Sequence, residues 1–147
     1  MNSENPSAPG VSIARASSAT DKKIEKKFQL TLEAGHCGSA VVLHCQGRVI
    51  FHREARAVAT IVAEVLPSAH RMVVDLGGID AIDSGGLGEL VLTHMWAEAS
   101  GYSLKFASAK RSVRHLFEIT NLVSVLDMYT SVPEAIAAMV SEEIHSA

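Results

Sequence analysis

The residues with the most obvious capacity for chemistry are seven histidines and two cysteines in a chain of 147 residues. Two His-Cys neighbours stand out, His36-Cys37 and His44-Cys45. A zinc site needs ligands at spacings such as C-x₂₋₄-C or H-x₃₋₅-H on a loop or helix face. His44 and Cys45 are adjacent in a predicted strand and therefore point to opposite faces. We expect no metal site, and we predict that Cys45 is a small core residue.

A second segment that could take part in catalysis is Asp83-Ser84-Gly85-Gly86, in which a serine follows an acidic residue. The serine next to an acid does not stand in the G-x-S-x-G pattern of a nucleophile elbow. The glycines lack the lysine of a phosphate-binding loop. Asp80 and Asp83 are the nearest carboxylates, and no general acid is placed opposite a general base. An enzyme is therefore the weaker hypothesis, and we predict no cofactor. The alternative that stays open is a small enzyme or ligand carrier that holds an anion at the turn 77–86.

The segment around these residues, 73–91, has the sequence VVDLGGIDAIDSGGLGELV. It predicts a buried strand that runs into a glycine-rich turn and then into an apolar helix. Ser84 is predicted to be the N-cap, with its hydroxyl bonded to an amide of the first turn. Gly85 and Gly86 would leave the first helical amides bare, and such a helix start attracts anions and carboxylates. The alternative is a tight strand-to-helix connection that binds nothing.

The elements that must position this segment alternate between strands and helices. Such an order requires an α/β architecture in which at least part of the sheet is parallel. Strands are predicted at 28–32, 40–46 (continued after a bulge at 48–51), 71–76, 103–107 and 125–129, and helices at 53–66, 84–100, 110–119 and from 131. Pro67 is expected to end the first helix.

The composition fits one domain with a real core, because 48% of the residues are hydrophobic and 20% are charged. A net charge of −3 argues against a nucleic-acid partner. No apolar run reaches the ~18–20 residues of a membrane span. With no secretory signal and no disulfide framework, we expect a cytoplasmic protein. Residues 1–26 lack apolar periodicity and are predicted to be a disordered tail, which leaves 27–147 as the domain.

Residues 73–91 also resemble the characteristic segment of the STAS domain, which is found in bacterial anti-sigma factor antagonists. The family pattern is a hydrophobic strand followed by D-L-S-x-V-x-x-I-D-S-[ST]-G-L-G-x-L. The matching residues are Asp75, Leu76, Gly77, Ile79, Ile82, Asp83, Ser84, Gly86, Leu87, Gly88 and Leu90. Gly47 and the segments 113–122 and 131–135 resemble further family features, so the resemblance extends over about residues 28–141.

The resemblance implies a mixed, mostly parallel sheet with helices packed mainly on one face. It also implies a non-enzymatic protein that binds an anti-sigma factor with serine kinase activity. In such networks the unphosphorylated antagonist captures the kinase and frees a sigma factor. Phosphorylation of a serine or threonine then separates the complex, because it adds about −1.5 to −2 charges at the helix start within the docking surface.

Two positions depart from the family pattern. The phosphoacceptor position is Gly85, which has no hydroxyl, and the neighbouring Ser84 matches the preceding serine of the pattern. As an N-cap, Ser84 would be only a weak substitute acceptor. Ile50 replaces an acidic residue that lies near the acceptor loop in many members. We therefore predict an antagonist-like protein that is not switched at the usual site. The alternative is a non-switching scaffold or accessory subunit of a stress-signalling or lipid-transport complex.

The predicted partner surface combines the helix start with two apolar side chains. It comprises Asp83, Ser84, Gly85, Gly86, Leu87, Ile50 and Trp96. Trp96 is the only tryptophan, and we expect it to pack under a neighbouring helix. The alternative is a partly exposed Trp96 that anchors a partner. The oligomeric state stays open, a homodimer included.

Overall fold

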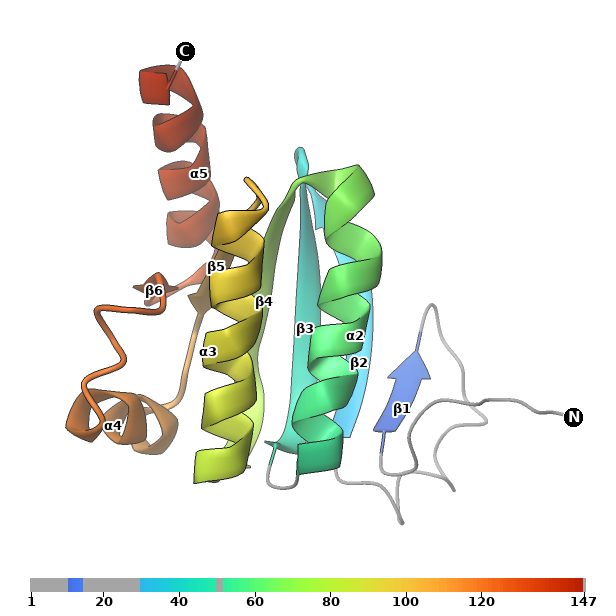
Figure 1. The fold of residues 1–147 in the computed structure, drawn as a ribbon, viewed down its shortest axis with the longest axis vertical. Helices are drawn as coiled ribbons and strands as arrows, with labels where there is room; N and C mark the ends of the chain where they lie inside the picture. The colour runs from blue at the N-terminus through green and yellow to red at the C-terminus, as the bar shows by residue number, and fades with distance from the viewer. Residues whose placement is uncertain (1–10, 15–29, 50–51, 147) are drawn as a thin grey trace, which may run out of the picture.

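A computed structural model describes residues 11–14, 30–49 and 52–146 of the chain. In these residues, six strands form one sheet with the order β1-β2-β3-β4-β5-β6 (Figure 1). Only β2 and β3 pair in antiparallel fashion, and the other neighbours are parallel. The elements are β1 (Val11–Ala14), β2 (Leu30–Cys37), β3 (Ala40–Val49), α2 (His52–Ala69), β4 (Arg71–Ile82), α3 (Ser84–Ala99), β5 (Ser103–Ala107), α4 (Arg111–Ile119), β6 (Met128–Tyr129) and α5 (Val132–Ser146). The predicted mixed, mostly parallel α/β sheet is confirmed.

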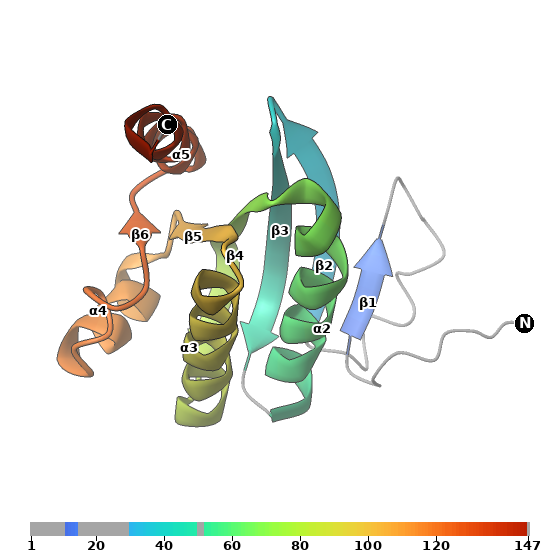
Figure 2. The same cartoon turned by 45° about the horizontal axis from the view of Figure 1, so that its top comes forward.

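The two faces of the sheet are covered unequally. Along β4, Met72 and Val74 face a large apolar core beneath α2, α3 and α4. Val73 points to the opposite face, where it packs with Ala135 and Met139 of α5 in a much smaller cluster. Alternate residues of a strand face opposite sides, so one strand supports both cores. Figure 2 shows α2 and α3 side by side on one face and α5 apart from them. The expected packing of helices mainly on one face is confirmed.

His44 and Cys45, adjacent on strand β3, point to opposite faces of the sheet, as predicted. The His44 side chain is exposed, and its Nδ1 lies 2.7 Å from Oδ2 of Asp75 on β4. Cys45 is buried in the core, and burial raises the pKa of its thiol. The thiol is therefore protonated and unreactive at neutral pH.

Strand β4 is longer than the predicted 71–76, because it continues to Ile82 through the expected glycine-rich turn. The pairing with β3 shifts here, with His44 opposite Asp75 and Gln46 opposite Gly78. A Cβ atom on Gly78 would lie 2.7 Å from the Cys45 carbonyl oxygen. The missing side chain lets the strands come close at this bulge, so the ladder continues where a turn was expected.

The segment predicted to be a tail contains one short strand. This is β1, whose Val11 pairs with Leu30 of β2. This strand gives the otherwise unpaired edge of β2 hydrogen-bond partners. The rest of 1–26 lies outside the described residues, and a domain boundary at 27 stays a prediction.

Pro67 does not end helix α2, which continues to Ala69. A proline removes one backbone donor, but its fixed φ of about −65° is helical, so the residues after Pro67 can continue the helix. The N–H of His70 donates to the Leu66 carbonyl at 2.7 Å and closes the helix end. The last predicted strand is also shorter than 125–129, since only Met128–Tyr129 pairs with β5. None of the helices in the described part of the chain is long and apolar enough to cross a membrane.

Candidate functional site: the start and outer face of helix α3

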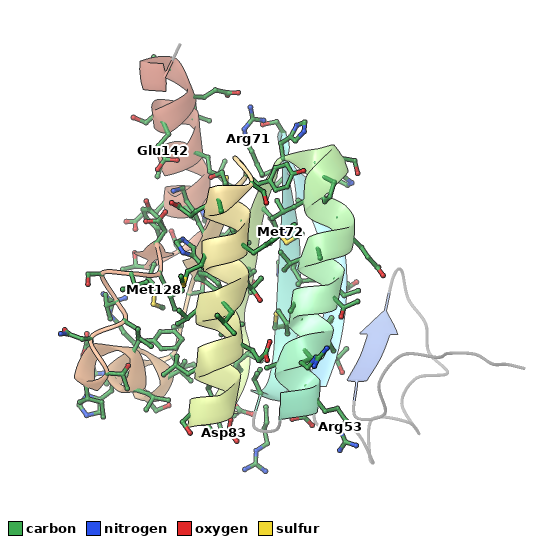
Figure 3. The ribbon with its side chains drawn as sticks, in the orientation of Figure 1. Arg53, Arg71, Met72, Asp83, Met128 and Glu142 are labelled. Atoms are coloured by element: carbon green, nitrogen blue, oxygen red, sulfur yellow. The ribbon has the colours of Figure 1, made fainter. Side chains whose placement is uncertain are left out.

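The start of α3 is capped by an aspartate. Asp83 has an extended backbone (φ −101°, ψ 179°), and its Oδ1 accepts a hydrogen bond from the Gly86 N–H at 2.8 Å. The Asp83 N–H donates to the Val49 carbonyl at 3.3 Å, which ties the helix start to the end of β3. In Figure 3, Asp83 lies at the same end of the molecule as Arg53, and Arg71 lies at the opposite end. The prediction that Ser84 is the N-cap is wrong, because the Asp83 carboxylate already holds the Gly86 amide.

Ser84 is instead the first residue of the helix. Its side chain is exposed and makes no hydrogen bond to the described residues. The amides of Ser84 and Gly85 also have no acceptor within the described part of the chain. Free amides at the positive end of a helix dipole favour a carboxylate or another anion. The predicted bare amides are thus present at these two positions but not at Gly86.

Glycine is required at one position of this helix start and not at its neighbours. A Cβ on Gly86 would lie 2.3 Å from the Val49 carbonyl oxygen, well inside van der Waals contact. A Cβ on Gly85 would meet only Asp83 Oδ1 at 3.6 Å, and one on Gly88 would meet nothing within 4 Å. Gly86 therefore lets α3 sit directly on the end of β3. Gly85 and Gly88 are exposed and leave room for side chains.

Two of the predicted partner residues, Gly86 and Leu87, are buried beneath the helix start. Leu87 is 4% exposed and belongs to the main core, and Gly86 is buried against Val49. Neither offers a surface to a partner, so their expected role as direct contacts is corrected to one of fixing the helix start. Ile50, the remaining predicted contact near this end, lies outside the described residues.

The outer face of α3 carries apolar side chains that are exposed. Leu92 is 61% exposed, Met95 55% and Trp96 39%. Trp96 packs one side against Tyr102, with ring centroids 5.8 Å apart, and keeps the rest open. The expectation that Trp96 packs under a neighbouring helix is therefore wrong, and the alternative of a partly exposed side chain describes it better.

Helical spacing joins this apolar patch to the helix start. Residues 85, 88, 92 and 95 are three or four positions apart, so they lie along one face of the helix. All four are exposed. We call Gly85, Gly88, Leu92, Met95 and Trp96 the outer face of α3. Sequence analysis missed Leu92 and Met95 because α3 is apolar nearly all round, and its periodicity does not show which side faces solvent.

The sheet order, the unequal helix layers and the exposed helix start define the class of protein as a small α/β domain built like the STAS fold. A family model confirms this independently, since the STAS domain model matches residues 31–135. The chain belongs to the STAS domain family.

Solved structures of the same fold come from different kinds of protein. An anti-sigma factor antagonist from Mycobacterium paratuberculosis is 19% identical with a TM-score of 0.65, and the match covers 74% of this chain and 92% of that one. The anti-sigma factor antagonist SpoIIAA in its unphosphorylated form is 18% identical with a TM-score of 0.60, over 75% of this chain and 96% of that one. The mouse anion transporter Slc26a9 is 13% identical with a TM-score of 0.59, over 74% of this chain but 19% of the transporter.

Proposed function

We propose that this chain is a partner-binding protein of the anti-sigma factor antagonist type. It binds an anti-sigma factor with serine kinase activity in the cytoplasm, and it thereby regulates transcription that depends on a sigma factor. Membership of the STAS family and the fold shared with SpoIIAA support this proposal. The observation that carries it is the outer face of α3, where an open helix start and exposed apolar side chains lie on one side of one helix.

The chemistry of this face suits a protein partner. The amides of Ser84 and Gly85, which have no acceptor among the described residues, can donate hydrogen bonds to the carboxylate of an acidic side chain at the positive end of the helix. About 18 Å further along the helix, at a rise of 1.5 Å per residue, Trp96 supplies an aromatic anchor. Leu92 and Met95 lie between these two points and add apolar area. An interface with a polar end and an apolar centre follows from this arrangement.

The same geometry supports binding without the usual phosphorylation switch. Position 85 has no hydroxyl, although the space around Gly85 would admit one. Ser84 has an exposed hydroxyl, but successive residues of a helix are rotated by about 100°. A kinase that places its phosphate at position 85 therefore meets the Ser84 hydroxyl in the wrong direction. We expect the chain to stay in its unphosphorylated, binding-competent form.

Capture of partners from an extract of its own host cells tests the proposal. The wild-type chain should retain an ATPase of the kinase type, identified by mass spectrometry, and Leu92→Glu should lose most of it. Ile144→Glu is the matched control, because Ile144 is exposed to a similar degree but lies on α5. The proposal fails if no such ATPase is retained, or if both variants retain it as well as the wild type.

A non-switching scaffold is the second candidate function, and the glycine at the acceptor position favours it. The fold of this chain also occurs as one part of the larger transporter Slc26a9, where it spans 19% of the chain. In that case the same capture experiment should return subunits of a transport or stress-signalling complex and no kinase-like ATPase.

A further inference from the structure

A cleft of about 430 Å³ opens between the last turns of α3, strand β5 and helix α5, at the end of α3 far from Ser84. Charged side chains line it, among them Glu98, Lys105, Asp127 and Glu142. His94 of α3 borders this group and is only 5% exposed. Its Nε2 is buried and has no hydrogen-bond partner among the residues that the structure describes. An unpaired polar atom in the interior costs free energy, so a partner for Nε2 is to be expected.

Two carboxylates stand around this nitrogen at distances too long for hydrogen bonds. His94 Nε2 lies 3.7 Å from Oε2 of Glu98 and 3.9 Å from Oδ2 of Asp127. The three atoms lie within 4.8 Å of one another. His94 and Glu98 are four residues apart on α3 and so share a face. Asp127 comes from the chain just before β6, on the other side of the cleft.

This spacing fits an ion between the three atoms. Ligand atoms held about 2.0–2.1 Å from a tetrahedral zinc ion are roughly 3.3–3.4 Å apart. The two distances from His94 Nε2 exceed this by about 0.3–0.6 Å. The Glu98 and Asp127 side chains are 58% and 40% exposed, so small rotations of both can take up the difference. The two carboxylate oxygens, which lie within 4.8 Å of each other, approach by the same rotations. The residues therefore need little movement to coordinate one cation.

The charges around the cleft also fit a doubly charged cation. Among the described residues that line the cleft, four carboxylates (Glu98, Asp127, Glu142 and Glu143) stand against two cations (Arg71 and Lys105), so two negative charges are left over. Lys105 is 1% exposed and donates to Glu142 at 2.7 Å and to Asp127 at 3.3 Å. These two hydrogen bonds hold the Asp127 and Glu142 carboxylates in position at the cleft.

We propose that His94, Glu98 and Asp127 form a binding site for one divalent transition-metal ion of the zinc class. An imidazole nitrogen with two carboxylate oxygens suits zinc and its neighbours better than magnesium or calcium, which prefer oxygen ligands alone. Water would complete the coordination. The bound ion would tie α3 to the chain before β6. This site lies away from the helix start and does not depend on the proposed function.

Titration of the full chain with Zn²⁺ and with Co²⁺ tests the site. The background variant is Cys37→Ser, because Cys37 is an exposed thiol that binds zinc by itself. Calorimetry should show one Zn²⁺ per chain. Co²⁺ should give the visible absorption of a low-coordinate site. Glu98→Gln should weaken Zn²⁺ binding by at least about tenfold. The fold should not change, since Glu98 lies on the surface.

Two more variants separate this site from other histidines. His94→Leu should abolish the cobalt absorption and leave the melting temperature in EDTA unchanged or higher, because it removes an unpaired buried nitrogen. His44→Gln, the matched control at an exposed histidine on β3, should bind both ions as the background variant does. The proposal is overturned if the folded background variant shows no saturable binding. It is also overturned if Glu98→Gln and His94→Leu bind as tightly as the background variant.

Discussion

The two ends of helix α3 are held in the fold by different forces. At its start, Gly86 brings the helix backbone into direct contact with the Val49 carbonyl, and the Asp83 carboxylate closes the first turn. Towards its end, side-chain charges replace backbone contact, with His94 beside a carboxylate pair and the buried Lys105. At the start, Gly86 therefore tolerates no added atom, although Gly85 and Gly88 do. At the far end we expect the loss of a charged partner to matter most.

The largest expected effect is steric and falls at the helix start. Gly86→Ala places a methyl group 2.3 Å from the Val49 carbonyl oxygen. Overpacking of this kind costs about 1–3 kcal/mol, and the melting temperature should fall by several degrees or more. Thermal unfolding monitored by circular dichroism measures this fall in melting temperature.

Gly88→Ala is the matched control for that change, because a Cβ at Gly88 meets nothing within 4 Å. Replacing this helical glycine should stabilise the protein by about 0.5–1 kcal/mol. If both variants melt at the same temperature, the close approach at Gly86 does not hold the helix start.

A smaller effect is expected at the charged end. Lys105→Met removes the hydrogen bonds to Glu142 and Asp127. Both carboxylates are partly exposed, so water takes over part of the interaction, and we expect a loss of about 1–2 kcal/mol of unfolding free energy. Denaturant unfolding in EDTA measures it.

The pH dependence of this loss gives a further check. The folded pKa of Lys105 is raised, so its contribution is complete below the ordinary lysine value of about 10.4 and is lost as the pH rises through the folded value. The difference between the wild type and Lys105→Met should therefore stay constant between about pH 7 and 9 and shrink in more alkaline solution. A difference that already shrinks at neutral pH would contradict a charged, paired Lys105.

The smallest effect distinguishes the two neighbouring cap candidates. Asp83→Ala removes the acceptor for the Gly86 amide and should cost about 1 kcal/mol. Ser84→Ala should change the unfolding free energy by less than about 0.5 kcal/mol, because its hydroxyl makes no cap bond. Equal losses in the two variants would show that both side chains share the cap.

The difference between the two ends of α3 also explains which features the sequence could predict. Apolar periodicity predicted the sheet layers and most helices, since Met72, Val74 and similar residues must be buried wherever they lie. The family pattern located the segment at the start of α3. It could not decide between Asp83 and Ser84 as the cap, because both are good capping residues and only the backbone geometry separates them.

The charged end was missed for a different reason. His94 and Asp127 are 33 positions apart and meet only through the packing of α3 against the sheet edge, so no local spacing predicts the cluster. Lys105 lies within the apolar strand segment SLKFA, where a lysine gives no sign that it is buried. The exposed Leu92 and Met95 were hidden in the same way, because an apolar helix does not reveal its outer side.

The most direct test of the proposed function is intact-mass spectrometry after incubation with the captured kinase and ATP. The wild-type chain should keep its mass, and Gly85→Ser, which restores an acceptor where the structure has room for one, should gain about 80 Da, the mass of one phosphate. A gain of this size on the wild-type chain, mapped to Ser84, would contradict an antagonist that stays in the binding-competent form.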